Sequence, residues 1–216
     1  MAKYRLCLFD YNGTLQDDLH YIYECGPQRI FRQFGLPCPT IDEYRNEVSG
    51  DFMKSFYWPR GIPAHVTAED LNAIMKQAMK ERGEPAKLFP DAAAAVRGVW
   101  HAGCRSVLVS AYDAAKLAEG VARHGLTPYF DEVIGDVRDK AAVFRGVMAR
   151  HGVTPGSAAA VGDMVEDAVA AAAAGATPFI CPRGFHGPER IAAARGQVPE
   201  IVVIDSLSDL LAHLAG

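Results

Sequence analysis

The sequence predicts an α/β protein with a doubly wound parallel sheet, and three observations favour this fold class. An apolar run of strand length lies close to the N-terminus, at residues 6–9. Helical patterns then follow one another over residues 16–86, and strand and helix patterns alternate after Pro90. Repeated strand–helix units form parallel sheets with helices on both faces. With 216 residues, half of them hydrophobic, the chain can build one sizeable core and a small accessory unit.

The first predicted strand is followed by an acidic residue and a turn. Asp10 ends the apolar run, Gly13 lies three residues later, and Thr14 comes next. Open parallel sheets bind ligands outside the carboxyl ends of their strands. A carboxylate in that place can act as a nucleophile or as a metal ligand. A plainer alternative is that Asp10 caps a following helix, since Asp is a favourable N-cap residue.

A helical insertion is predicted after this turn. The patterns indicate a helix over residues 19–34, a second from Thr40 with a capping box, a short piece over 51–58, and a fourth helix over 67–82. No strand pattern separates these pieces. We therefore expect residues 16–86 to be an all-helical insertion placed on the end of the first strand.

Strands and helices alternate through the rest of the chain. Several helical patterns end on glycine, which is the usual residue after a helix C-cap. Strands are expected at residues 105–110, 132–135, 158–161, 177–181 and 201–204, and helices at residues 91–101, 114–124, 139–151, 164–174, 188–195 and 207–214. No GxGxxG motif follows the first strand and no P-loop motif is present, so the main signals of nucleotide binding are missing.

Composition and charge argue against several classes of partner. The net charge is −4 and the basic residues form no stripe, so we expect no nucleic-acid partner. No apolar run is long enough to cross a bilayer and the N-terminus lacks a signal-peptide core, so we expect no membrane association. The five cysteines are scattered without CxxC spacing, which favours reduced thiols of a cytoplasmic protein over disulfides or a zinc site.

Reactive side chains stand at the predicted strand ends. Ser110 ends the second strand and Lys140 begins the helix after the third. Asp163 ends the fourth, and Asp167 lies one helical turn later. Each residue alone has an ordinary explanation, such as a helix cap or a surface charge. Together with Asp10 they supply a nucleophile, a hydroxyl, a cation and an acid pair suited to Mg²⁺, which are the groups that phosphoryl transfer requires.

These residues stand in four motifs whose order resembles the haloacid dehalogenase (HAD) superfamily. The motifs are residues 10–15 (DYNGTL), Ser110 after an apolar strand, Lys140, and residues 162–167 (GDMVED). They span nearly the whole chain and are specific as a group. The resemblance is to the branch with a helical cap inserted after the first motif, to which phosphoglycolate-phosphatase-like hydrolases belong.

The resemblance implies a Rossmann-like core of residues 1–15 and 87–216, and a helical cap of residues 16–86 that selects the substrate and excludes water. It implies a Mg²⁺-dependent phosphatase that hydrolyses a small phosphorylated metabolite through an aspartyl-phosphate on Asp10, in a monomer or homodimer. The implied phosphate-binding residues are Gly13, Ser110, Ala111 and Lys140. The implied Mg²⁺ ligands are Asp10, the backbone carbonyl of Asn12, Asp163, and Asp167 bound directly or indirectly.

One position departs from the pattern of the phosphatases in this superfamily. Their motif has a second Asp, which protonates the leaving oxygen and then activates water, where this chain has Asn12. An amide cannot shuttle a proton near neutral pH, so the proton-transfer role of this position is open. One alternative is a phosphatase whose leaving group needs little protonation or takes a proton from water or a cap group, with Asp17, Asp18 and His20 as candidates. The others are a catalytically weak protein that binds or senses a phosphorylated ligand, and a metal-independent 2-haloacid dehalogenase, which the intact acid pair of the last motif disfavours.

The cap contains several candidate substrate contacts: Phe52, Lys54, Tyr57, Trp58 and Arg60. A Lys or Arg there could meet a substrate carboxylate or a second phosphate. The favoured alternative is that the aromatic residues form the cap's own small core and that the charges are solvated.

Overall fold

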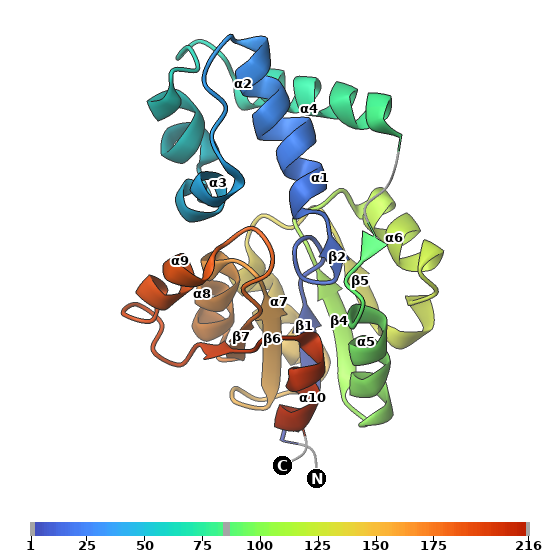
Figure 1. Cartoon of the computed structure of the whole chain (residues 1–216). Helices are drawn as coiled ribbons and strands as arrows, with labels where there is room; N and C mark the ends of the chain where they lie inside the picture. The colour runs from blue at the N-terminus through green and yellow to red at the C-terminus, as the bar shows by residue number, and fades with distance from the viewer. Residues whose placement is uncertain (1–2, 84–86, 215–216) are drawn as a thin grey trace.

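The protein forms a six-stranded parallel sheet covered by helices (Figure 1). The computed structural model describes residues 3–83 and 87–214. The strands lie in the order β5–β4–β1–β6–β7–β8, and all neighbouring pairs are parallel. Their bounds are Leu6–Phe9 for β1, Arg105–Val109 for β4, Glu132–Ile134 for β5, Ala158–Gly162 for β6, Thr177–Ile180 for β7 and Val202–Val203 for β8.

Helices cover both faces of the sheet, which confirms the predicted α/β fold class. Alternate residues of β1 point to opposite faces, with Cys7 and Phe9 in one apolar cluster and Leu6 and Leu8 in another. The first face is covered by α5 (Ala92–His101), α6 (Ala114–Arg123) and α10 (Leu207–Leu214), and the second by α7 (Lys140–Arg150) and α8 (Val165–Ala174), with α9 (Pro188–Ala194) packed beside α8.

No helix in the described ranges has the length and apolar character needed to cross a membrane.

The strand order reverses direction at β1. From β1 the chain goes to β4 and β5 on one side, and then crosses to β6, β7 and β8 on the other. The register pairs Phe9 with Val161, and Asp10 N donates to Val161 O at 2.9 Å. The carboxyl ends of β1 and β6 therefore lie side by side at a topological switch point, where ligands of open α/β sheets bind.

Residues 19–82 form a helical segment that lies over the carboxyl ends of the strands (Figure 1). The helix predicted over residues 19–34 is one continuous run with a π-helical turn in its middle. That turn contains Pro27, which has no N–H to give to an α-helical hydrogen bond. The elements are α1 (Leu19–Tyr23), the π turn Glu24–Gln28, α2 (Arg29–Gln33), α3 (Ile41–Glu47), a π turn Met53–Tyr57, a 3₁₀ turn Trp58–Arg60 and α4 (Ala68–Arg82).

The helical segment has an apolar core of its own. The rings of Phe31, Phe56 and Tyr57 pack with centroids 5.3 to 5.9 Å apart. Phe52 is half-buried in the same cluster, whereas Trp58 is exposed. The core therefore accounts for most of the aromatic residues of this segment, in agreement with the alternative favoured from the sequence.

The expectation that residues 16–86 contain no strand is wrong at one end. Residues Gln16–Asp17 form a two-residue strand, β2, that pairs antiparallel with β3 (Lys87–Leu88). Backbone groups need partners where the chain leaves the sheet and where it returns, and the two passages supply them to each other. The boundaries of the predicted core and cap domains stay a prediction.

Arg45 of α3 joins the helical segment to the loop that follows β7. Its Nε donates to Gly184 O at 2.9 Å, and its Nη2 donates to Pro182 O at 3.0 Å and His186 O at 3.3 Å. His186 is buried, and its Nε2 lies 3.2 Å from Val48 O in the helical segment. These bonds hold one side of the helical segment against the sheet.

Candidate active site

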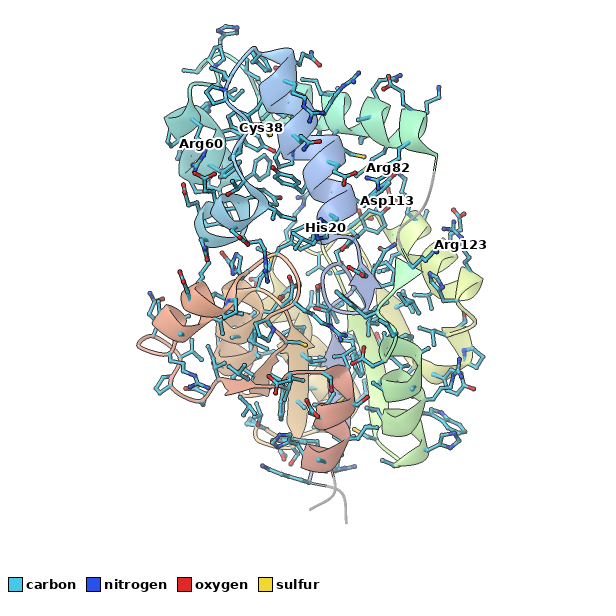
Figure 2. The ribbon with its side chains drawn as sticks, in the orientation of Figure 1. His20, Cys38, Arg60, Arg82, Asp113 and Arg123 are labelled. Atoms are coloured by element: carbon cyan, nitrogen blue, oxygen red, sulfur yellow. The ribbon has the colours of Figure 1, made fainter. Side chains whose placement is uncertain are left out.

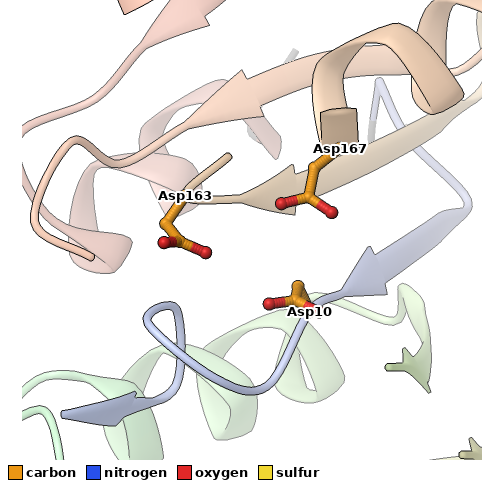
Figure 3. A group of neighbouring side chains, drawn as sticks. All are labelled: Asp10, Asp163 and Asp167. Atoms are coloured by element: carbon orange, nitrogen blue, oxygen red, sulfur yellow. The ribbon is translucent and has the colours of Figure 1, made fainter. Parts of the chain in front are cut away.

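Three carboxylates converge at the switch point (Figure 3). Asp10 directly follows β1, Asp163 directly follows β6, and Asp167 lies in the first turn of α8. One oxygen from each lies within 4.8 Å of the others, and all three residues are buried. The structure thus brings together the nucleophile and the acid pair that the sequence predicted.

Lys140 is the cation of this cluster. It begins α7, and its Nζ lies 2.7 Å from Asp10 Oδ1 and 2.5 Å from Asp167 Oδ1. Charge-assisted hydrogen bonds of this kind are stronger than neutral ones. The ammonium group therefore holds the carboxylates of Asp10 and Asp167, from two different strand–helix units, in one place.

Burial and charge shift the pKa values of the cluster in opposite directions. Burial raises the pKa of Asp10 to about 6, although Lys140 lowers it and Asp167 raises it further. Burial also raises the pKa of Asp163, and the charges of Asp10 and Asp167 add to that effect. Burial alone would lower the pKa of Lys140, but its two carboxylate partners outweigh this and raise it. Lys140 therefore stays charged at every physiological pH.

Asp163 is oriented by two groups of the surrounding loops. Phe185 N donates to its Oδ2 at 2.5 Å, and the Thr14 hydroxyl lies 3.3 Å from its Oδ1. A Cβ built at Gly13 or at Gly184 would stand against the Asp163 carboxylate at less than 3.0 Å, where real Cβ atoms are not found. Gly13 also has φ of +70°, a conformation that favours glycine. Both loops can therefore approach this carboxylate so closely only with glycine at positions 13 and 184.

The side chain of Asn12 contacts Asp18. Asn12 Nδ2 lies 2.5 Å from Asp18 Oδ2, and Gly13 N donates to Asp18 Oδ1 at 2.8 Å. Asp18 is buried, and burial raises its pKa to about 7 although both hydrogen bonds lower it. Asp17 and His20 are exposed, and Figure 2 shows His20 at the junction of the helical segment and the sheet. Of these three acid–base candidates, Asp18 is the one in contact with Asn12.

Ser110 and Ala111 follow β4, the neighbour of β1. The register pairs Phe9 with Leu108, so Asp10 and Ser110 lie at the same end of adjacent strands. Ser110 is buried, and its Oγ accepts a hydrogen bond from Tyr112 N at 3.3 Å. The phosphate-binding roles of Gly13, Ser110 and Ala111 stay a prediction.

The sequence matches the model of a known protein family. The model is described as haloacid dehalogenase-like hydrolase, and it matches residues 4–175, a range that contains Asp10, Ser110, Lys140 and Asp163. The chain belongs to this family. The resemblance inferred from the motifs is thereby confirmed, and the protein is a HAD-like hydrolase. No curated protein matches the chain.

Solved structures share the fold of this HAD-like hydrolase. A predicted phosphoglycolate phosphatase from Haemophilus somnus 129pt is 18% identical with a TM-score of 0.75, and the match covers 98% of each chain. A predicted phosphatase from Clostridium acetobutylicum is 20% identical with a TM-score of 0.76 and 97% of each chain covered. CbbY from Rhodobacter sphaeroides in complex with phosphate is 20% identical with a TM-score of 0.70, covering 98% of this chain and 99% of that one. At these identities the likeness concerns the fold.

The donor set of this HAD-like hydrolase fits a hard divalent cation. Among the described residues, the three carboxyl groups of Asp10, Asp163 and Asp167 outnumber the one ammonium group bonded to them, that of Lys140. An uncompensated buried charge is costly, and a divalent cation would neutralise it. Carboxylate oxygens are the ligands that Mg²⁺ prefers. The side chain of Asn12 is turned to Asp18, which leaves its backbone carbonyl as its predicted ligand atom.

Phe185 and Gly184 contribute to the site although the sequence analysis did not single them out. Both lie in the loop after β7, at the carboxyl end of a strand that contributes no acid. The local signal was the glycine spacing of the segment PRGFHG at residues 182–187, directly after a predicted strand. Because glycine is common in loops of every kind, this signal does not by itself indicate a site.

The Gly184→Ala variant tests the close approach of this loop to Asp163. The added methyl group must displace either the carboxylate or the loop, so we expect a loss of stability of about 1–3 kcal/mol and a loss of any metal binding. Thermal unfolding and metal titration measure the two effects. Gly196→Ala is the matched control, because a Cβ there meets only Ala193 O at 3.6 Å. Equal stability and equal metal binding of the two variants would show that the loop does not need glycine at position 184 to approach Asp163.

The Asp18→Asn variant tests the buried carboxyl next to Asn12. Between pH 4 and 7 the folded protein keeps a proton on Asp18 that the unfolded chain, with an ordinary pKa of 3.8, has lost. The free energy of unfolding of the native protein therefore falls as the pH rises through this window. In the variant, this pH-dependent fall in the free energy of unfolding should be smaller by on the order of 4 kcal/mol.

Urea unfolding at a series of pH values, in the presence of a chelator, measures this difference. Asp17→Asn is the matched control, because Asp17 is the exposed neighbour of the buried Asp18. We expect Asp17→Asn to keep the pH dependence of the native protein. If Asp18→Asn kept it as well, the carboxyl of Asp18 would not be protonated in the folded state near neutral pH.

Proposed function

We propose that the protein is a Mg²⁺-dependent phosphatase that hydrolyses a small phosphomonoester through Asp10. The observation that carries this proposal is the cluster of three buried carboxylates with Lys140 between Asp10 and Asp167. It joins a nucleophile to a site of high negative charge that a metal ion would complete. Phosphoryl transfer depends on such positioning and charge neutralisation more than on other chemistry.

The proposed reaction proceeds in two displacements at phosphorus. An oxygen of the Asp10 carboxylate attacks the phosphorus atom, the bond from phosphorus to the ester oxygen breaks, and the leaving oxygen takes up a proton. Water then attacks the phosphorus of the aspartyl-phosphate, loses a proton, and releases inorganic phosphate with the Asp10 carboxylate restored. Mg²⁺, when bound by Asp10, Asp163 and Asp167, would neutralise the negative charge of the phosphoryl oxygens.

The residues of the chain have distinct parts in this proposal. Lys140 keeps Asp10 ionised and offers its ammonium protons to the phosphoryl oxygens. Ser110 and the backbone amide of Ala111 would donate to the same oxygens. Gly13 allows the loop after β1 to pass close to Asp163. Asn12 would provide its carbonyl oxygen to the metal and cannot act as an acid.

The descriptions of the solved structures support this proposal. Two are described as predicted phosphatases, and CbbY has been solved with phosphate and, as a variant, with xylulose-1,5-bisphosphate. A second candidate function, binding or sensing of a phosphorylated ligand, is favoured by Asn12, since general acid–base help is worth about 10²–10⁴-fold in rate. Stoichiometric aspartyl-phosphate that does not turn over would favour this second function.

Removal of the metal or of the nucleophile tests the phosphatase proposal. Phosphate release from phenyl phosphate should require Mg²⁺, fall by about 100-fold or more with a chelator, and disappear in the Asp10→Asn variant. The assay is colorimetric detection of inorganic phosphate. Release that is unaffected by the chelator would point to the metal-independent alternative, and no release under any condition would reject the phosphatase reaction.

The position of Asn12 predicts a strong dependence on the leaving group. Without an acid at this position, kcat/KM for a series of aryl and alkyl phosphates should fall steeply as the leaving alcohol becomes less acidic. Asn12→Asp alone would set a second carboxylate against Asp18, so the informative variant is the exchange Asn12→Asp with Asp18→Asn.

We expect this exchange to flatten the dependence and to raise turnover of alkyl phosphates by about 10²-fold or more. Asp18→Asn alone is the control and should keep the steep dependence. Intact mass is checked in each preparation, because deamidation of the Asn12–Gly13 pair would create the acid without mutation. An equally steep series for the exchange variant would show that position 12 does not limit proton transfer.

A further inference from the structure

An apolar cavity of about 310 Å³ lies between the helical segment and the sheet. Ile22 of α1, Met75 of α4 and Phe52 contribute to its wall from the helical segment, and Met164 and Phe185 contribute from the sheet side. No charged side chain of the described residues lines it. Its polar groups are few and neutral, among them the side chains of Ser49 and Asn72.

This cavity adjoins the carboxylate cluster. Phe185 N donates to Asp163 Oδ2, and Met164 N donates to Asp167 Oδ2 at 3.1 Å, so two residues of the wall are bonded to the acids of the site. Tyr44, also in the wall, has a pKa that burial raises and that the charges of Asp18 and Asp163 raise further. A phosphomonoester with its phosphoryl group at Asp10 could therefore extend its leaving group into this space.

The two cations of the helical segment that were candidates for substrate contact, Lys54 and Arg60, are engaged elsewhere, and so is Arg45. Arg60 pairs with Glu47 and stacks on the Phe56 ring at 4.4 Å from its centroid, and Figure 2 shows it in the helical segment, away from the strand ends. Lys54 pairs with Asp51 at 2.9 Å, and Arg45 donates to backbone carbonyls of the loop after β7. A substrate carboxylate or second phosphate in the cavity would therefore be desolvated, and no cation in the described part of the chain lines the cavity to pair with it.

We infer that the substrate is a phosphomonoester with a single anionic group, its phosphate, and an uncharged, largely apolar leaving group of about one ring that occupies this cavity. This inference rests on the proposed function and adds the substrate class to it. The volume is near the lower end for ligand sites, which sets the size of the leaving group. Apolar surface buried against the cavity wall supplies the binding energy, and the neutral polar groups can orient a ring substituent.

A second cavity of about 260 Å³ is the competing location for the leaving group. It lies on the other side of Ile22, which lines both cavities, and it includes Asn12, Asp18, Lys116 and the ion pair of Glu119 with Arg123. The ammonium group of Lys116 in its wall could pair with an anionic leaving group. The two cavities thus predict opposite substrate preferences.

Paired substrates test the inference. Phenyl phosphate and 4-carboxyphenyl phosphate have similar aryl leaving groups and differ by one negative charge. We expect kcat/KM with Mg²⁺ to be at least about tenfold higher for phenyl phosphate, because the carboxylate would lose its hydration in an apolar cavity. Calorimetric binding of phenylphosphonate and 4-carboxyphenylphosphonate gives the same comparison without turnover, so the preference is measured even if the phosphatase reaction fails.

Two variants of α4 form a matched pair. Asn72→Lys adds a cation to the cavity wall, whereas Ala73→Lys adds the same charge at the next exposed position, which does not line the cavity. Asn72→Lys should reduce or reverse the preference for the uncharged ligand, and Ala73→Lys should leave it unchanged. Thermal unfolding checks that both variants fold.

Equal use of both ligands, or preference for the carboxylated one, would overturn the inference, whether it is measured by turnover or by phosphonate binding. If Lys116→Ala then abolished a preference for the carboxylated ligand, the leaving group would lie in the second cavity. Rejection of the phosphatase reaction together with a tenfold preference for phenylphosphonate would leave the ligand class in place and exclude only the turnover.

Discussion

The contact of Lys140 with both Asp10 and Asp167 is the interaction on which the site depends. Three acids at the carboxyl ends of two adjacent strands would repel one another without it, and their burial would protonate them. The ammonium group removes part of this repulsion and fixes two of the carboxylates. The carboxyl groups that Lys140 leaves without a cation are what makes the site suited to a divalent cation.

The parallel sheet explains why these groups meet. Asp10, Ser110 and Asp163 follow the carboxyl ends of β1, β4 and β6, and β1 lies between the other two strands, so groups far apart in the sequence share one edge. The loop after β7 adds a contact from a further strand. It carries the Phe185 amide to Asp163 and is held against the helical segment by Arg45. One loop thus contacts both the helical segment and the carboxylate of Asp163.

The amide at position 12, where the phosphatases have an acid, and the apolar cavity favour the same class of substrate. A site without an acid at Asn12 is best suited to leaving groups that depart with little protonation. Phenols leave with little protonation, and an aryl group also fits an apolar wall better than a sugar or a carboxylate does. The two features involve different residues, and their agreement comes from the chemistry of one class of substrate.

The six-stranded sheet and the list of reactive groups could be predicted from the amino-acid sequence alone. Strand ends are visible as apolar runs, and Asp10, Ser110, Lys140 and Asp163 follow from them because parallel strands end at one edge. The bond of Asn12 to Asp18, the contact of the Phe185 amide with Asp163 and the neutral wall of the cavity became visible only in the folded structure. These depend on the direction of side chains in loops and on contacts between distant segments, which no periodicity in a sequence encodes.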